Sequence, residues 1–358
     1  MSRPTCLYVD SDALLHNVNI IKQHVKDKKI IAMVKANAYG CGLSSVLPVI
    51  EKQVYAFGVA CIEEAIEVRK LSHNCECILF QGIFSPEELQ TVARLQLQCV
   101  IHQKIQLDWI LATPMPSKLK IWVKVDTGMH RLGFAIEEVI DVIQALTNCP
   151  WVESNIGLMT HLACADEPHA KKNKDQLAQF NAITIQHVDI TRSIANSAAI
   201  LTLPKAHADV VRPGIMLYGV SPFANQTGHE LGLQPVMQFM SEVTSIHHYP
   251  AYESVGYGST WRSEKPSVIG IVPVGYGDGY PRHIGLNTPT YVAGHIAPIV
   301  GRVSMDMLTI DLTDCPNVKL NDQVELWGKH IPVEVVAQAA GTIPYELLCQ
   351  VSRRVIRK

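Results

Sequence analysis

A lysine closes an apolar run near the start of the chain, in the stretch VKANAYGCG at residues 34–42. The full run, KIIAMVKAN, is apolar enough to predict a parallel strand buried on both faces, with Lys35 at its carboxyl end. In a structural interpretation, the stem of Lys35 covers the core surface and its ammonium reaches water. In a chemical interpretation, burial lowers the pKa of the amine, which can then attack a carbonyl carbon. The stretch alone favours the structural interpretation.

A second stretch, RPGIMLYG at residues 212–219, has the features of an anion site. Pro213 is suited to the first turn of a helix, and Gly214 allows the backbone to approach a ligand closely. Free backbone N–H groups at the start of a helix bind phosphate, and the helix dipole assists them. We therefore expect a phosphate site at this stretch.

The segments that position these residues alternate between short apolar runs and amphipathic stretches from residue 30 to about residue 220. Helical spacing is seen in CIEEAIEVRKLSH, SPEELQTVARLQ, AIEEVIDVIQALTN and HAKKNKDQLAQFNAITIQHV. The apolar runs that predict strands are IIAMVKA, YAFGVA, CILFQG, QCVIH, IWVKVD, IGLMTHL, RSIANS and DVVRPGIMLYGV. Eight such units predict a (β/α)8 barrel. An open doubly wound sheet is the alternative, although no GxGxxG motif follows the first strand.

The composition of the chain changes after residue 220. The stretch SPFANQTGHELGLQ is typical of a linker, and short β-rich runs punctuated by Gly, Pro and Asn follow it. We expect two domains, a barrel at residues 1–225 and a mostly β domain at residues 226–358.

In such a barrel, the side chains that do chemistry gather at the carboxyl ends of the strands. The residues expected there are Lys35, Tyr39, Lys124, Arg131, His161, Asn196, Ser197, Arg212 and Gly214. Each has an ordinary structural explanation, but their convergence on one face indicates a site. Barrels often bind phosphate after strands seven and eight, where Ser197 and Gly214 are expected. A phosphate there and a lysine at the end of the first strand together indicate pyridoxal phosphate held as a Schiff base.

Composition limits the possible partners and compartments. The chain has 358 residues, of which 47% are hydrophobic, and a formal net charge of -2 without any run of Lys and Arg, which argues against nucleic acid as a partner. No signal peptide or apolar stretch of spanning length is evident, so we expect a cytoplasmic protein without a membrane partner. The ten cysteines are scattered, which predicts reduced thiols, and their spacing does not predict a metal site.

The chain resembles the alanine racemases. The stretch AMVKANAYGCG is similar to the pyridoxal phosphate attachment signature of that family. Its other characteristic segments are matched in order by KVDTGMHRLGF, MTHLACAD, ANSAA, RPGIMLYG, VGYGSTW, GYGDGYPR and GRVSMDM. The resemblance extends from the N-terminal strand to the last thirty residues. It implies a racemase of fold type III, with a barrel that binds the cofactor and a β domain that contributes to the active site of a partner subunit.

The resemblance implies two bases on opposite faces of the substrate Cα. Lys35 is expected to hold the cofactor as an aldimine and then, once the substrate amine displaces it, to act on one face. Tyr257 matches the family tyrosine that acts on the other face and comes from the partner subunit. Because the ordinary pKa of tyrosine is about 10, its surroundings must stabilise the phenolate or share its proton. Without the resemblance, Tyr257 is interpreted as an ordinary strand aromatic.

The resemblance also assigns residues around the cofactor. Arg212 is expected at the pyridine nitrogen, where it keeps that nitrogen unprotonated, and His161 is expected to support Arg212. Arg131 is expected to reach the phenolic oxygen of the cofactor and the substrate carboxylate, which also binds the backbone N–H of Met305. The other expected cofactor contacts are Tyr39, Asn196, Ser197, Gly214, Ile215 and Tyr345.

Further residues match the substrate entrance of the family. Tyr257 and Tyr345 correspond to its narrow inner gate. The charged outer part, which steers a zwitterion inward, corresponds to Asp166, Arg282 and Arg302. Lys124 corresponds to a lysine that is carbamylated in some members and then positions the arginine matching Arg131.

The implied function is the interconversion of L-alanine and D-alanine by a head-to-tail homodimer, which supplies D-alanine for peptidoglycan. One alternative is a broad-specificity racemase for serine or lysine, although Tyr257 and Tyr345 are expected to exclude long side chains. A second is a decarboxylase of the same plan, but such enzymes place an acid at the pyridine nitrogen instead of Arg212. A third is a non-catalytic pyridoxal phosphate carrier, which lacks the β domain.

Overall fold

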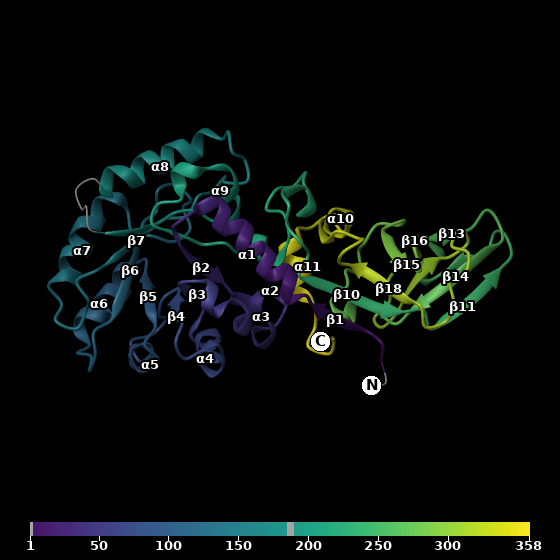
Figure 1. The fold of residues 1–358 in the computed structure, drawn as a ribbon, viewed down its shortest axis with the longest axis horizontal. Coiled ribbons are helices and arrows are strands. Elements are labelled where there is room, and N and C mark those ends of the chain that lie inside the picture. Colours follow the sequence, from purple (N-terminus) through teal and green to yellow (C-terminus); the bar gives the residue numbers. More distant parts are fainter. Residues whose placement is uncertain (1–2, 185–189) are drawn as a thin grey trace. The chain divides into compact units, whose positions relative to one another are not determined.

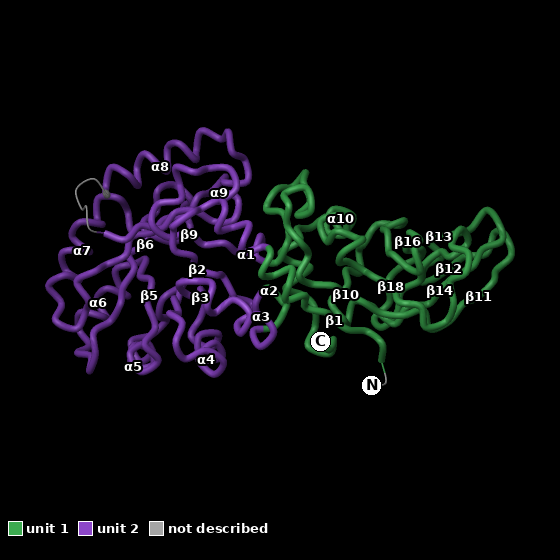
Figure 2. Tube along the Cα trace, in the orientation of Figure 1, with its two compact units in different colours: residues 1–16, 39–42, 218–358 green, residues 17–38, 43–217 purple. Residues whose placement is uncertain are grey.

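The computed structural model describes residues 3–184 and 190–358 of the chain (Figure 1). Two compact units make up this part of the chain (Figure 2). Residues 17–38 and 43–217 form one of them, which we call the barrel unit. Residues 1–16, 39–42 and 218–358 form the other, which we call the β unit.

Eight parallel strands close into a barrel, and the last of them, β9, pairs with the first, β2. They are β2 (Lys29–Met33), β3 (Ala56–Val59), β4 (Glu76–Leu79), β5 (Gln98–Ile101), β6 (Lys120–Lys124), β7 (Gly157–Met159), β8 (Thr191–Ser193) and β9 (Val210–Val211). Each overlaps one of the eight apolar runs identified from the sequence. The predicted (β/α)8 barrel is therefore confirmed, and the open sheet is excluded.

A helix or helical turn follows each barrel strand along the chain. The α-helices between strands are α3 (Leu43–Ile50), α4 (Ile62–Leu71), α5 (Glu88–Arg94), α6 (Lys104–Ala112), α7 (Val139–Thr147), α8 (Lys171–Thr184) and α9 (Ser197–Thr202). Short 3-10 turns are η1 (Glu51–Gln53), η2 (Ile136–Glu138), η3 (Pro204–Ala206) and η4 (Ile215–Tyr218). The helix predicted at residues 169–188 is α8, and residues 185–189 lie outside those described. A further helix, α1 (Ser11–Val25), begins in the β unit and ends in the barrel unit.

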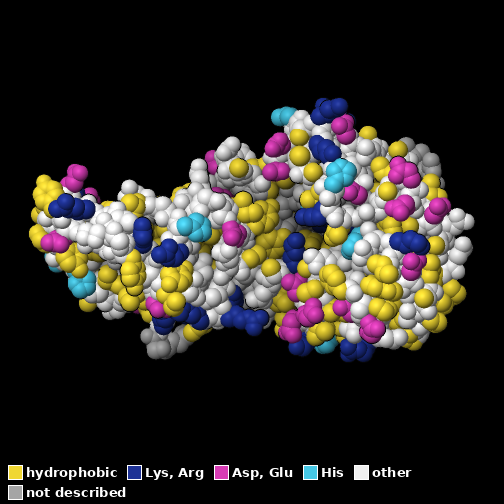
Figure 3. Space-filling model, turned by 180° about the vertical axis from the view of Figure 1, so that it is seen from behind, with side chains coloured by type: hydrophobic (Ala, Val, Ile, Leu, Met, Phe, Trp, Pro, Cys, Tyr) yellow, Lys and Arg dark blue, Asp and Glu magenta, His cyan; other side chains and the backbone are white. Residues whose placement is uncertain are grey.

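The barrel strands are buried on both faces. All residues of β3 and β5 are buried, as are the last four residues of β2. Parallel sheets require this because helices cover their outer face and side chains fill the interior. On the face seen in Figure 3, Lys and Arg side chains and Asp and Glu side chains are both present on the surface.

The β unit contains a mixed sheet of nine strands in the order β11-β14-β17-β16-β15-β18-β10-β1-β19. The bounds are β1 (Cys6–Val9), β10 (Met237–Glu242), β11 (Ser245–Tyr249), β14 (Ser267–Val272), β15 (Pro289–Val292), β16 (His295–Val300), β17 (Leu308–Asp311), β18 (Gln323–Trp327) and β19 (Ile356–Arg357). The first strand of the chain, β1, pairs with β10 on one side and with the last strand, β19, on the other.

Smaller elements complete the β unit. They are the hairpin β12 (Ser254–Val255) and β13 (Trp261–Arg262), the helices α10 (Val333–Ala339) and α11 (Pro344–Gln350), and the turns η5 (His229–Leu231), η6 (Tyr257–Ser259) and η7 (Tyr276–Asp278). Alternate residues of β10 are buried, which is the pattern of a strand with one core face. That face packs an aromatic cluster in which Phe239 and Tyr280 lie 4.7 and 5.8 Å, ring to ring, from Trp327. In the described ranges, no helix combines the length and apolar composition needed to cross a membrane.

A buried carboxylate joins the two ends of the chain to the turn η7. Asp278 has a fully buried side chain and accepts hydrogen bonds from Arg3 Nη1 at 2.5 Å, from Arg354 Nε at 2.7 Å and from the Gly275 N–H at 2.8 Å. Burial disfavours its charge, but these hydrogen bonds and the charge of Arg3 outweigh that effect and lower the pKa of Asp278. Arg354 also donates to the Met305 carbonyl at 3.2 Å, so the same cluster holds the loop that carries Met305.

Asp278→Asn should therefore lower the thermal unfolding midpoint at neutral pH. We expect a loss of about 2 kcal/mol, less than the roughly 3–5 kcal/mol of a fully buried pair, because both arginines are partly exposed. A carboxylate with a lowered pKa stabilises the fold above its unfolded pKa, and this contribution is lost as the pH falls through the folded pKa. The midpoints of wild type and variant, measured from pH 7 into the acid range below the ordinary value of 3.8, should converge.

Asp306→Asn is the matched control. Asp306 pairs with Arg354 at 2.9 Å, but its side chain is 54% exposed. The thermal unfolding midpoint of Asp306→Asn should therefore stay near that of wild type. If the unfolding midpoints of Asp278→Asn and wild type differed by the same amount at every pH, the ionised carboxylate of Asp278 would not be the stabilising group.

Candidate active site

Positively charged side chains converge at the carboxyl ends of the barrel strands. Lys124 is the last residue of β6, Arg212 directly follows β9, and Lys35 lies two residues after β2. Arg131, in the loop after β6, is close enough to act electrostatically on Lys124 together with the other two. The structure therefore brings together four cationic residues that the sequence placed at this face.

A network of hydrogen bonds fixes the guanidinium of Arg212, which is only 5% exposed. Nη1 donates to Ser193 Oγ at 2.7 Å, and Nη2 contacts the carbonyl oxygens of Thr160 at 2.7 Å and Ile194 at 3.0 Å and the Nδ1 atom of His161 at 3.3 Å. Burial lowers the pKa of Arg212 to about 10, which still leaves it charged at neutral pH. Nε and the second N–H of Nη1 make no hydrogen bond to the described residues, so two N–H groups of a fixed guanidinium remain for a ligand.

His161 is neutral in this setting. Burial, followed by the positive charges of Arg212 and Lys124, holds the pKa of His161 well below its ordinary value. Because a guanidinium only donates, Nδ1 must accept from Arg212, which places the ring proton of His161 on Nε2. The histidine thus supports the orientation of Arg212 without adding a charge.

Lys124 has an unusually low proton affinity. Burial, then the charges of Arg212, Arg131 and Lys35, lower the pKa of Lys124 to about 8. An appreciable fraction of this amine is therefore unprotonated near neutral pH, which makes Lys124 a nucleophile as well as a cation.

Protein groups at the expected phosphate site form hydrogen bonds with one another. Ser197 Oγ accepts the N–H of Gly214 at 2.9 Å and that of Met216 at 3.4 Å, so these two N–H groups are bonded within the protein. The short 3-10 turn η4 begins at Ile215, where the sequence indicated the start of a helix. Because its oxygen accepts these N–H groups, the Ser197 hydroxyl is oriented to donate its own proton to an anion. Asn196 caps α9, its Oδ1 accepting the Ala199 N–H at 3.0 Å.

Lys35 is exposed in the structure. The four residues after it, from Ala36 to Tyr39, all have backbone φ angles between 51° and 54°. This places them in the left-handed region, which non-glycine residues rarely adopt. The strand predicted before Lys35 therefore ends in one left-handed helical turn, α2 (Lys35–Tyr39).

Arg131 and Asp166 lie in exposed loops of the barrel unit. The loop with Arg131 is shaped by Asp126, whose Oδ1 accepts the N–H groups of Gly128 at 2.8 Å and His130 at 3.0 Å. These bonds fix the backbone while leaving the Arg131 side chain exposed, as a ligand-binding arginine requires.

Within the β unit, Tyr39 lies in an aromatic group. Its ring stacks on Tyr218 with centroids 4.7 Å apart and lies 6.2 Å from the ring of Tyr345. Burial, then the proximity of Tyr345, raises the pKa of Tyr39. The phenol of Tyr39 therefore stays protonated and can only act as a neutral hydrogen-bonding group.

A second part of the β unit presents an exposed group of residues that we call the Tyr257 surface: Tyr257, Tyr276, Arg302, Met305 and Met307. Tyr257 is 68% exposed and Met305 is 53% exposed. Backbone hydrogen bonds from Tyr276 to the Ser304 carbonyl at 3.1 Å and from Gly277 to the Met305 carbonyl at 2.9 Å join two of its loops. Arg282 is also exposed. Such a concentration of exposed aromatic and methionine side chains is typical of protein interfaces.

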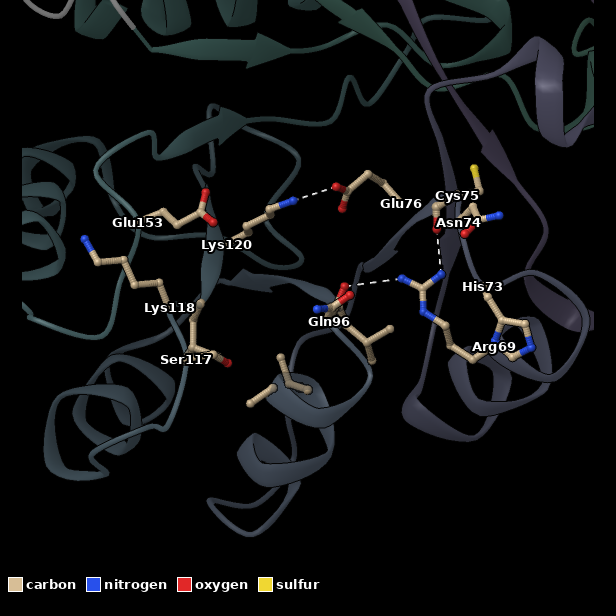
Figure 4. Close-up of a pocket in the computed structure, with 14 residues that line it drawn as sticks. Arg69, His73, Asn74, Cys75, Glu76, Gln96, Ser117, Lys118, Lys120 and Glu153 are labelled. Atoms are coloured by element: carbon tan, nitrogen blue, oxygen red, sulfur yellow. Dashed lines mark hydrogen bonds and ion pairs between the residues drawn. The ribbon is translucent and has the colours of Figure 1, made fainter.

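The opposite end of the barrel has a different character. A pocket of about 320 Å³ lies beside the amino ends of β4 to β6 (Figure 4). Lys120 pairs with Glu76 at 2.5 Å, and Arg69 donates to the carbonyl oxygens of Leu95 and Cys75 at 2.9 and 2.6 Å. These cations are engaged in structural contacts, as is usual for the amino end of a barrel. Within the part of the chain that the structure describes, no group of three His, Cys, Asp or Glu side chains could hold a metal ion.

Sequence reasoning missed several residues that shape the site. Ser193 and Thr160 bind Arg212, and Glu64 accepts the N–H of Ala36 beside Lys35. Ser193 and Thr160 lie in predicted strands next to predicted site residues, which is the signal that could have indicated them. Glu64 had no such signal, because it lies in an ordinary amphipathic helix.

Two family descriptions match the chain in succession. Residues 9–222 match "Alanine racemase, N-terminal domain", and residues 236–358 match "Alanine racemase, C-terminal domain". The chain belongs to the alanine racemase family. The resemblance identified from its motifs is thereby confirmed.

Individual relatives agree with this alanine racemase assignment over the whole chain. An alanine racemase of Legionella pneumophila (strain Lens) is 59% identical over 355 residues, which are 99% of each chain. The biosynthetic alanine racemase of Pseudomonas aeruginosa has a crystal structure with a TM-score of 0.95 and 42% identity, covering 99% of each chain. The alanine racemase of Bartonella henselae, described with covalently bound pyridoxal phosphate, has a TM-score of 0.89 and 32% identity, covering 99% of each chain.

Proposed function

We infer that this chain is an isomerase that interconverts L-alanine and D-alanine with pyridoxal phosphate as cofactor. The observation that carries the inference is the continuous match to both alanine racemase domains, with 59% identity to a full-length relative. A decarboxylase is disfavoured by Arg212, and a non-catalytic carrier is disfavoured by the presence of the β unit.

The residues of the barrel unit fit pyridoxal phosphate. Ser197, oriented by the Gly214 and Met216 N–H groups, offers a hydroxyl to the phosphate. The Nε of the buried Arg212 can meet the pyridine nitrogen, and the exposed amine of Lys35 can bind the aldehyde. The other proposed cofactor contacts are Tyr39, Arg131, His161, Asn196, Ile215 and Tyr345.

Proton transfer at the substrate Cα is assigned to two side chains. The bound cofactor supplies an electron sink that makes the Cα proton acidic. Lys35 removes or returns this proton on one face, and Tyr257 does so on the opposite face. Arg212 keeps its own proton at neutral pH, because its pKa is about 10, and therefore limits how far negative charge accumulates on the ring. Arg131 and the Met305 N–H hold the substrate carboxylate.

We propose that the active unit is a head-to-tail homodimer with two composite sites. Residues 1–225 bind the cofactor, and residues 226–358 supply Tyr257 and Met305 to the site of the partner subunit. The exposure of the Tyr257 surface supports this arrangement, since a catalytic tyrosine needs surroundings that its own loop does not provide. Tyr345 and Tyr257 narrow the inner entrance, and Asp166, Arg282 and Arg302 line its charged outer part.

We propose that the enzyme acts in the cytoplasm and supplies D-alanine for peptidoglycan. The structure describes all ten cysteines and pairs none of them in a disulfide, and most are buried. This pattern is typical of proteins from reducing compartments.

The proposed reaction is tested by racemase assays with purified protein and by borohydride reduction followed by peptide mapping. We expect turnover of alanine well above that of serine or lysine, because the entrance tyrosines exclude long side chains. We also expect a reduced cofactor adduct on Lys35. Preference for lysine would support the broad-specificity alternative, and carbon dioxide release would support the decarboxylase.

Tyr257→Phe should retain the cofactor and lose most racemisation that starts from L-alanine, by roughly a hundredfold or more, because one of the two proton-transfer groups is removed. Absorbance measures cofactor content, and circular dichroism at a fixed substrate concentration measures the rate. Tyr252→Phe is the control, since Tyr252 is an equally exposed tyrosine of the β unit outside the Tyr257 surface. A near-normal rate for Tyr257→Phe would remove this residue from the mechanism.

We propose that Lys124 reacts with carbon dioxide. Its unprotonated amine attacks the carbon of CO2, a C–N bond forms as one C=O π bond breaks, and the amine releases one proton. Counted from the ammonium form, two protons leave and a cation becomes a carboxylate beside Arg131. The lowered pKa of about 8 supports this reaction, because only the unprotonated amine can attack.

Protein equilibrated with ¹³C-labelled bicarbonate should show a carbamate carbon resonance that is absent from Lys124→Gln. Its intensity should rise between pH 7 and pH 9, as Lys124 loses its proton. Lys120→Gln, at the other end of the same strand, should keep the resonance. Persistence of the resonance in Lys124→Gln would assign the carbamate to another lysine.

A further inference from the structure

The turn that carries Lys35 is intrinsically strained. Ala36, Asn37, Ala38 and Tyr39 have φ angles of 52°, 54°, 54° and 51°, in the left-handed region. For residues other than glycine, this conformation costs roughly 1–2 kcal/mol each. Four in succession persist only where surrounding contacts determine them, and such strain is concentrated at functional sites.

Two backbone contacts hold the start and end of this turn. The Val34 N–H donates to the Gly58 carbonyl at 2.9 Å, which ties the residue before Lys35 to the end of β3. The Ala38 N–H donates to the Val34 carbonyl at 2.8 Å and so closes the turn. Asn37 Oδ1 accepts the Leu43 N–H at 3.0 Å, which connects the turn to the start of α3.

The peptide group next to Lys35 is held by a different kind of contact. Glu64, in the first turn of α4, accepts the Ala36 N–H on Oε1 at 2.6 Å. Its other oxygen, Oε2, accepts the Ala60 N–H at 2.7 Å, just before the same helix. One carboxylate therefore bridges two segments that follow neighbouring barrel strands, through short charge-assisted hydrogen bonds.

This bridge has a direct consequence for Lys35. The Ala36 N–H belongs to the peptide group that contains the Lys35 carbonyl, so its orientation depends on the ψ angle of Lys35. Holding that peptide group fixes the direction in which the Cα–Cβ bond of Lys35 leaves the backbone. Because the Lys35 side chain is long, restricting its backbone also limits the positions that its amine can reach.

We propose that Glu64 is a positioning residue for Lys35, which it orients for covalent capture of the cofactor aldehyde. This inference rests on the proposed function, because it requires Lys35 to be the lysine that binds pyridoxal phosphate. Helix capping alone does not account for Glu64, because the contact to Ala36 reaches a segment 28 residues away. The neighbouring Glu63, also in the first turn of α4, interacts instead with Cys61, the residue just before the helix.

The test separates orientation of Lys35 from general binding at the site. The full chain is freed of cofactor with hydroxylamine, and two ligands are compared. Pyridoxal phosphate can be captured by Lys35, which is measured by borohydride trapping over time. Pyridoxine phosphate has no aldehyde, so its dissociation constant reports only the noncovalent site. Three variants are compared with wild type: Glu64→Gln, Glu64→Asp and the control Glu63→Gln.

Glu64→Gln should slow capture of pyridoxal phosphate by Lys35 by about tenfold to a hundredfold, because a displacement of about 1 Å costs this much. Its affinity for pyridoxine phosphate should stay within about threefold of wild type. Glu64→Asp keeps the charge but is one methylene shorter, so it should slow capture similarly while its thermal midpoint stays near that of wild type. Glu63→Gln should match wild type in both measurements.

The outcomes are distinguishable. A wild-type chain without label on Lys35 would overturn the proposed function itself. A labelled wild type with equally fast capture in Glu64→Gln and Glu64→Asp would overturn only the role of Glu64. An equal loss of capture rate and of affinity for pyridoxine phosphate would also overturn the role of Glu64 in positioning Lys35, because Glu64 would then stabilise the cofactor site as a whole. If Glu64→Gln does not fold, Glu64→Asp decides the question by the same criteria.

Discussion

The burial of one guanidinium determines much of the arrangement at the carboxyl end of the barrel. A charged group removed from water must have its hydrogen bonds satisfied by the protein, and Arg212 obtains them from the ends of β7 and β8. The ends of β7 and β8 must therefore lie beside Arg212. The burial of His161 and Lys124 lowers the pKa of both groups, and the charge of Arg212 adds to this effect. The hydrogen bond from Arg212 also sets the tautomer of His161.

The architecture of the barrel was predictable because its signal is repeated. Eight apolar runs that alternate with amphipathic segments leave few alternatives to a closed parallel barrel. The approximate location of Arg212, His161 and Lys124 was predictable for the same reason, since each follows or ends a predicted strand. The family assignment required the motifs themselves, and periodicity alone did not provide it.

Other features had no signal in the sequence. The residues KANAY have the composition of an ordinary helix, and nothing in them indicates left-handed φ angles, which are imposed by contacts with Gly58, Leu43 and Glu64. The hydrogen bond between the Gly214 N–H and Ser197 Oγ joins residues 17 positions apart and could not be anticipated from either stretch. The exposure of Lys35 likewise depends on tertiary structure. Sequence reasoning identified which residues matter, whereas their conformations required the coordinates.

The position of β1 has a consequence for synthesis of the chain. This strand is made before the barrel strands, yet its two partners in the sheet are β10, at residues 237–242, and β19, at residues 356–357. All eight strands of the barrel lie between β1 and β10 in the sequence. On the ribosome, the barrel strands are therefore complete while residues 6–9 still have no sheet to join, and the ladder with β19 cannot form until residues 356–357 have been made. A long delay of this kind leaves an apolar strand, CLYV, unpaired through most of translation, when it is available to chaperones.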